Sequence, residues 1–125
     1  MKRQYTGPEI CIDFLCGRLT LSRLPGPKLH IRSTTITAEC SGHTYSKTYE
    51  EDFDLLGDTN DRATIEHSRA DPWEVCSKVG RCTDNSKPIT LSVSVKINDG
   101  RPAETATFVV RFANGKLVNA EPVQD

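Results

Sequence analysis

The residues best suited to chemistry in this chain are its five cysteines, Cys11, Cys16, Cys40, Cys76 and Cys82. The first two are five positions apart and the last two are six apart, so an odd thiol remains however the cysteines pair. We expect Cys76 to bond to Cys82 across a turn at Gly80, and Cys40 to bond to Cys11 or to Cys16. Spacing leaves the choice between Cys11 and Cys16 open.

A zinc site is the alternative use of four of these residues, Cys11, Cys16, Cys76 and Cys82. Structural zinc sites usually take cysteines in Cys-x-x-Cys pairs, whereas the gaps here are four and five residues. We therefore favour disulfides and expect no metal or other cofactor. The cysteine content also favours an oxidising compartment. Because residues 1–5 lack the apolar core of a signal peptide, we expect a secreted protein in its mature form, with its signal removed.

Catalytic motifs are weak in this sequence. His30, His43 and His67 lie in three separate segments, and none adjoins a nucleophile motif such as Gly-x-Ser-x-Gly. Glu39 and Glu50 could serve as a carboxylate pair, but with 17 acidic residues such pairs arise by chance. We therefore predict a protein that is not an enzyme.

Charge and hydropathy exclude two classes of partner. The formal net charge is -1 and the sequence pI is about 6.3, with both signs interspersed, so no field attracts phosphate backbones or anionic lipid. No apolar run approaches the ~20 residues of a membrane span. We expect neither nucleic acid nor membrane as a partner, and the oligomeric state stays open.

The elements that must position any site are predicted to be strands. Between Ile89 and Ile97 every odd position is apolar and every even one polar, which is the two-residue period of a half-buried strand. A second alternating segment covers 105–112 and ends at Asn114-Gly115, a strong turn signal. Gly and Pro together number 15, which favours many short strands joined by turns. The prediction is a single all-β domain over 1–125.

Three local features refine this fold. Asp71 as N-cap and Pro72 at the first helical position predict one short helix near 71–79. For Trp73 we favour the role of a core anchor over the alternative of stacking on a ligand. The apolar face switches parity within 33–35, which predicts a β-bulge. The segment 50–56 fits neither a helical turn nor a strand end cleanly, so both stay open.

The chain also contains a faint internal echo. A shift of 55 residues places Ile36 over Leu91 and Phe53 over Phe108, among five apolar matches. The domain is therefore either two similar halves, at about 9–62 and 73–118, or a pair of unrelated hairpins.

One family resemblance rests on this echo. The run Ile36-Thr37-Ala38-Glu39-Cys40, then Tyr45, then the segment Phe53-Asp54-Leu55-Leu56-Gly57-Asp58-Thr59-Asn60, resembles the half-repeat of the cyanovirin-N homology lectins. The resemblance covers about two thirds of the chain. Val95 departs from it, since the second half should carry a cysteine there, and Cys16 and Cys82 have no counterpart.

The resemblance implies two similar modules, each a three-stranded sheet with a hairpin, and metal-free sugar sites at opposite ends. The positions that match its binding loops are Asp58, Asn60 and Asp61 in one half and Asn114 in the other. We therefore expect a lectin that binds an oligosaccharide. The alternative is a small, secreted, disulfide-stabilised protein, such as a pathogen effector or toxin, that binds a host protein through its loops.

Overall fold

The computed structural model describes residues 5–7, 9–15, 17–23, 26–56, 65–84, 87–97 and 103–123. They form two antiparallel sheets and one short α-helix, which confirms the predicted all-β class. The smaller sheet has the strand order β1-β2-β3-β6 and contains β1 (Tyr5–Thr6), β2 (Cys11–Leu15), β3 (Arg18–Ser22) and β6 (Glu66–His67). The larger has the order β5-β4-β7-β8-β9 and contains β4 (Leu29–Cys40), β5 (His43–Leu55), β7 (Ile89–Ile97), β8 (Glu104–Ala113) and β9 (Lys116–Pro122).

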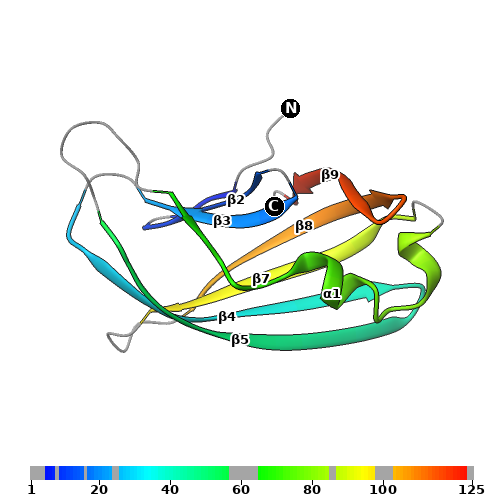
Figure 1. The fold of residues 1–125 in the computed structure, drawn as a ribbon, viewed down its shortest axis with the longest axis horizontal. Coiled ribbons are helices and arrows are strands. Elements are labelled where there is room, and N and C mark those ends of the chain that lie inside the picture. The colour runs from blue at the N-terminus through cyan, green and yellow to red at the C-terminus, as the bar shows by residue number, and fades with distance from the viewer. Residues whose placement is uncertain are drawn as a thin grey trace.

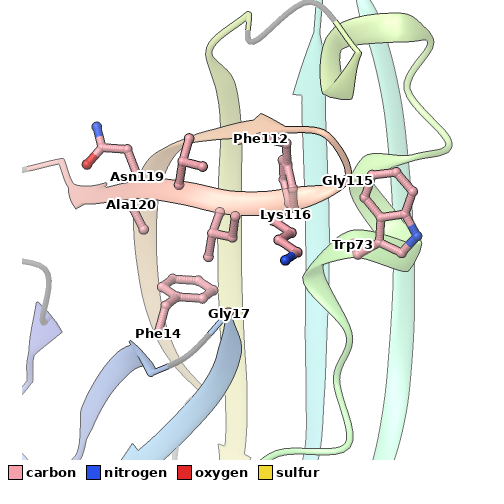
Figure 2. Close-up of a pocket in the computed structure, with 10 residues that line it drawn as sticks. Phe14, Gly17, Trp73, Phe112, Gly115, Lys116, Asn119 and Ala120 are labelled. Atoms are coloured by element: carbon pink, nitrogen blue, oxygen red, sulfur yellow. The ribbon is translucent and has the colours of Figure 1, made fainter.

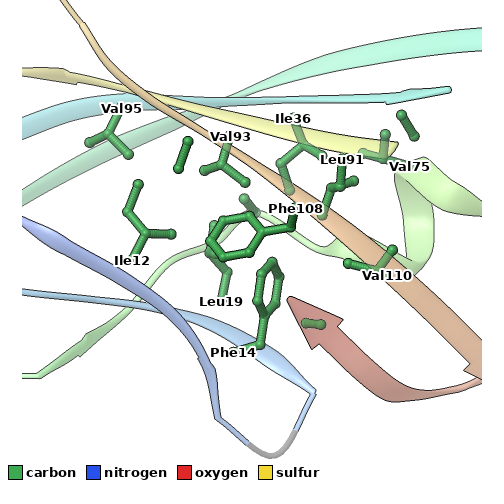
Figure 3. Close-up of a cluster of buried hydrophobic side chains, with 14 of the residues drawn as sticks. Ile12, Phe14, Leu19, Ile36, Val75, Leu91, Val93, Val95, Phe108 and Val110 are labelled. Atoms are coloured by element: carbon green, nitrogen blue, oxygen red, sulfur yellow. The ribbon is translucent and has the colours of Figure 1, made fainter. Parts of the chain in front are cut away.

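The two sheets pack face to face around one core. In Figure 1 the smaller sheet lies over β7 and β8, and α1 (Pro72–Cys76) lies beside β4 and β5. The predicted alternation of β7 is confirmed, because all five apolar residues from Ile89 to Ile97 are buried. Across the core, Phe14 of β2 meets Phe108 of β8 edge to face, with ring centroids 5.0 Å apart (Figure 3). Each large apolar side chain buried in this way contributes about 1.5–3 kcal/mol.

The outer face of the larger sheet carries hydroxyl side chains. Two rows cross four neighbouring strands, Thr48-Thr35-Ser94-Thr105 and Ser46-Thr37-Ser92-Thr107. Within the rows, hydroxyl oxygens lie 2.8 Å apart in both the Thr35–Thr48 and the Thr37–Ser46 pairs. Cross-strand pairs of this kind stabilise a sheet whose face meets water. The alternation of apolar and polar residues along these strands thus gives the larger sheet one face in the core and one hydrophilic face.

The structure shows where β4 bulges and where β5 ends. The register of β4 shifts between Ile31 and Ser33 against both of its neighbours, so the predicted bulge is present but lies nearer Arg32 than the expected 33–35. The sequence of segment 50–56 allows either a helical turn or a strand end. The structure shows a strand, since β5 continues to Leu55. The long β4–β5 hairpin therefore spans most of one edge of the sheet.

The structure corrects the disulfide prediction. Cys40 is bonded to Cys82, whereas Cys11 and Cys76 are free and buried. The expected Cys76–Cys82 bond and the expected bond of Cys40 to Cys11 or Cys16 are therefore wrong. The cause lies in the fold. Cys40 ends β4 beside the 3-10 turn η1 (Arg81–Thr83) that holds Cys82, while Cys76 lies on the apolar stripe of α1. Cys16 lies outside the described residues, and the zinc alternative loses Cys82 as a ligand.

Candidate functional site

A groove of about 550 Å³ opens where the two sheets and α1 meet. It is bordered by Phe14 near the end of β2, by Gly17 in the turn that follows, by Trp73 of α1, and by β9 from Lys116 onward. Figure 2 shows Phe14 and Trp73 on two sides of this space, beside β9. Three segments distant in sequence therefore build one depression.

Trp73 is the exposed aromatic ring of the groove. Its side chain is 40% exposed, so the predicted role of a core anchor is wrong. The ring packs edge to face on Phe112, which is buried, with centroids 5.7 Å apart. One side of the indole is thus fixed by the protein while the remainder faces solvent.

The orientation of Trp73 follows from the pattern of α1 and the turn after it. Pro72, Val75, Cys76 and Val79 are all buried. These positions follow the i, i+3, i+4, i+7 spacing of a helical apolar stripe, from which position 73 is excluded. Asp71 fixes the start of the helix as predicted, since its carboxylate accepts a hydrogen bond of 3.0 Å from the backbone N–H of Trp73. This stripe was a sequence signal that could have placed Trp73 on the surface.

A side-chain network ties α1 to β5 and so holds Trp73 in place. The Lys47 ammonium donates to Glu74 Oε1 at 2.6 Å, and the Tyr49 hydroxyl donates to the same carboxylate. The hydrogen bond from Lys47, and then that from Tyr49, lowers the pKa of Glu74. Burial and the bond to Glu74 raise the pKa of Tyr49, so its hydroxyl remains a donor.

The β8–β9 turn closes one end of the groove. Asn114 and Gly115 both adopt positive φ, 53° and 76°, as the predicted Asn-Gly hairpin turn requires. Gly115 lines the groove, and a Cβ added there would meet Trp73 Cη2 at 3.9 Å. The predicted site residue Asn114 is exposed on this turn, at the border of the groove. Asp58, Asn60 and Asp61, the other predicted site residues, lie outside the described residues.

Polar and apolar groups on β9 complete the wall. In Figure 2 the Lys116 ammonium extends into the space between Gly17 and Trp73, whereas the Asn119 amide points away from Phe14. Val118 also lines the groove and is 52% exposed. The site thus combines an aromatic surface with one exposed cationic side chain, that of Lys116.

A second hollow of about 320 Å³ shares Gly17 with the groove. Its wall includes Arg18, Arg69 and Asp71. Buried Glu51 positions this wall, since its Oε1 accepts from the backbone N–H of Arg69 at 2.6 Å and its Oε2 from the Ser68 hydroxyl at 2.7 Å. Because Gly17 lines both hollows and Pro72 adjoins Trp73, the two form neighbouring parts of one surface.

The histidines considered for catalysis do not meet in the structure. His30 contacts the acidic side chains of Asp52 and Asp54 at 2.9 and 2.8 Å, while His43 begins β5 and His67 lies in β6. Within the described ranges, no three His, Cys, Asp or Glu side chains are grouped as a metal site would require. In the same ranges no helix is long and apolar enough to cross a membrane. Comparison with protein-family models, curated proteins and solved structures finds no match.

Proposed function

We propose that this protein is a non-catalytic carbohydrate-binding protein whose binding site is the groove at Trp73. The observation that carries the proposal is the half-exposed indole, held on Phe112 at the side of a preformed groove. A pyranose ring presents an apolar face of C–H groups and an edge of hydroxyls. An aromatic surface beside a few polar groups suits both.

The rigidity of the groove supports this proposal. Trp73 is restrained by Phe112 and by the helix cap, and the Asn114–Gly115 turn has a defined conformation. A preordered aromatic side chain loses little rotamer entropy when a ligand binds, so more of the contact energy remains as affinity. Lys116 lines the groove and can donate hydrogen bonds to hydroxyls at the edge of a sugar ring, and Asn114 adds an exposed amide on the adjoining turn.

We also propose that the protein acts in an oxidising compartment, after secretion. The Cys40–Cys82 bond supports this, because structural disulfides persist mainly outside the cytosol. Asp58, Asn60 and Asp61 stay a hypothesis for a further sugar-binding loop.

A second candidate function is the docking of a host protein on the same surface. It is favoured by the exposure of both Val118 and Trp73 in the same groove, because exposed apolar side chains gathered at one place mark protein-binding sites and tryptophan is enriched in their hot spots. The two functions differ in their ligand, but both depend on Trp73. The same set of variants therefore tests both.

The test is a glycan array followed by fluorescence titration of each glycan that binds. Trp73 is the only tryptophan of the chain, so its emission reports on the groove without background. We expect binding to shift or quench this emission, and Trp73→Ala to weaken binding at least about tenfold on the array. Val123→Ala is the matched control, because it removes an exposed apolar side chain that does not line the groove.

Two results would contradict the sugar-binding proposal. A blank array with a folded protein would favour the protein-docking function. Glycan binding that survives Trp73→Ala unchanged would place the sugar site elsewhere on the molecule.

A further inference from the structure

The two hollows that meet at Gly17 differ in charge from the molecule as a whole. The chain has a formal net charge of -1. By contrast, three cationic side chains line the two hollows. Lys116 lines the larger hollow, and Arg18 and Arg69 line the smaller. Asp71 is the one acidic side chain lining either hollow among the described residues, and its Oδ1 accepts the Trp73 N–H. The combined surface is therefore locally basic.

We propose that the combined surface binds an acidic oligosaccharide whose charged groups are uronic acid carboxylates. This inference rests on the proposed function and names its ligand class. One sugar ring packs against Trp73 in the larger hollow. The carboxylate of a neighbouring ring reaches Arg18 and Arg69 across Gly17. Lys116 contacts the oligosaccharide between these two rings.

The chemistry of the two guanidinium groups favours a carboxylate. Each guanidinium is planar and presents paired N–H donors that match the two oxygens of a carboxylate. Both Arg18 and Arg69 are exposed, so their side chains can adjust to a ligand. The backbone of Arg69 is nevertheless fixed by its hydrogen bond to buried Glu51. The site thus offers adjustable donors on an ordered wall.

Gly17 lines both hollows, and the space around it is open. It adopts φ of 77°, and a Cβ built on it would meet no atom within 4 Å. The two hollows, about 550 and 320 Å³, together give room for more than one ring, since drug-sized ligands fill pockets of roughly 300–1,000 Å³. An oligosaccharide therefore fits this surface better than a single monosaccharide.

The experiment compares acid and ester forms of the same sugars. Tetramers of galacturonate, mannuronate and glucuronate, and their neutral methyl esters, are titrated against the intact protein with Trp73 emission and calorimetry. We expect at least one acid to bind about tenfold or more tightly than its ester. Arg18→Gln with Arg69→Gln should abolish that difference, whereas Trp73→Ala should weaken the acid and the ester together.

The matched control is Lys87→Gln with Lys96→Gln, which removes the same charge from exposed positions that do not line the hollows. It should retain the preference for the acid. Circular dichroism of each variant checks that the fold is intact.

Several outcomes would overturn the inference. Equal affinity for acid and ester, or binding of neutral glycans alone, would reject the acidic ligand and leave the carbohydrate-binding function standing. If a sulfated tetramer bound more tightly than any uronate, the claim that the charged groups of the ligand are carboxylates would be rejected. If the lysine control loses the preference for the acid as fully as the arginine variant does, the preference comes from the overall charge of the protein and not from this surface. Failure of every sugar, neutral and acidic, would reject the proposed function itself.

Discussion

At the scale of single residues, the carboxylate of Glu51 accepts hydrogen bonds from three residues of two other segments. It is buried, with 5% of its surface exposed. Its Oε2 accepts from the hydroxyls of Thr34 and Ser68, at 2.6 and 2.7 Å, and its Oε1 accepts the backbone N–H of Arg69. One carboxylate thus joins β4, β5 and the segment before α1.

We predict that Glu51→Ala lowers the free energy of unfolding by about 2–4 kcal/mol, because three donors lose their acceptor in a buried place. Urea denaturation measures the change. Glu50→Ala is the matched control, since Glu50 is the adjacent exposed residue of the same strand, and it should change stability by less than about 0.5 kcal/mol. Equal effects of the two substitutions would refute the role given to Glu51.

Val93 tests the two faces of the larger sheet. Its side chain is fully buried, so Val93→Asp places an unpaired charge in the core and should cost on the order of 4 kcal/mol. Ser94→Asp, one residue along and on the hydroxyl face, should cost far less. The readout is the midpoint of thermal or urea unfolding for each variant. Similar midpoints would mean that β7 is not oriented as described.

At the scale of elements, the attachment of α1 to β5 predicts a pH dependence. The pKa of Glu74 is lowered from its ordinary 4.5, chiefly by the hydrogen bond from Lys47. A depressed folded-state pKa contributes stability above the unfolded value, and this contribution is lost as the pH falls through the folded value. Wild type should therefore melt slightly higher than Glu74→Gln at pH 7.

Below pH 4.5 this gap should narrow, because protonated Glu74 no longer attracts Lys47. The Tm of both proteins, followed from pH 7 to pH 3, gives the comparison. The effect is small, since both partners are solvent-accessible and salt screens them. A constant gap across the range would show that the charge of Glu74 is not what attaches the helix.

The elements themselves were largely predictable from local pattern. Alternation fixed β7 and β8, and the Asn114-Gly115 pair fixed the turn between β8 and β9. The cap at Asp71 predicts the helix start correctly. For Trp73, residue type alone predicts the core, whereas its position off the buried stripe of Pro72, Val75, Cys76 and Val79 predicts the surface, where the ring lies. The segment 50–56 is ambiguous in sequence because Glu51 is a charged residue at a buried position and Leu56 is an apolar residue that is 51% exposed, so both interrupt the apolar alternation of a strand.

At the scale of the whole molecule, the groove was beyond local reasoning. Its walls come from β2, α1 and β9, and their meeting depends on how the two sheets pack. Of the predicted site residues in the described ranges, Asn114 borders the groove, through a turn signal that has its own structural cause. The cysteine pairing failed for the same reason, since Cys40 and Cys82 are 42 positions apart and only the tertiary fold joins them.

The disulfide predicts a distinct pattern of thiol chemistry. Cys76 is fully buried, and burial raises the pKa of its thiol to about 12, so it should resist alkylation in the folded protein. Peptide mapping without reduction should recover Cys40 linked to Cys82. Replacing both by alanine should cost on the order of 4 kcal/mol for a closed loop of this length. Recovery of a Cys76–Cys82 peptide would contradict this assignment.

The same bond also determines how the protein responds to mechanical force. A pull on the two termini cannot extend the covalent loop between Cys40 and Cys82, which contains β5, β6 and α1. At about 3.3–3.6 Å per residue, the 42-residue separation hides roughly 140–150 Å of contour length. Single-molecule stretching should release this length only after a reductant is added. The groove residue Trp73 lies within that loop, so under tension the oxidised chain keeps this part of the groove out of the direct line of force.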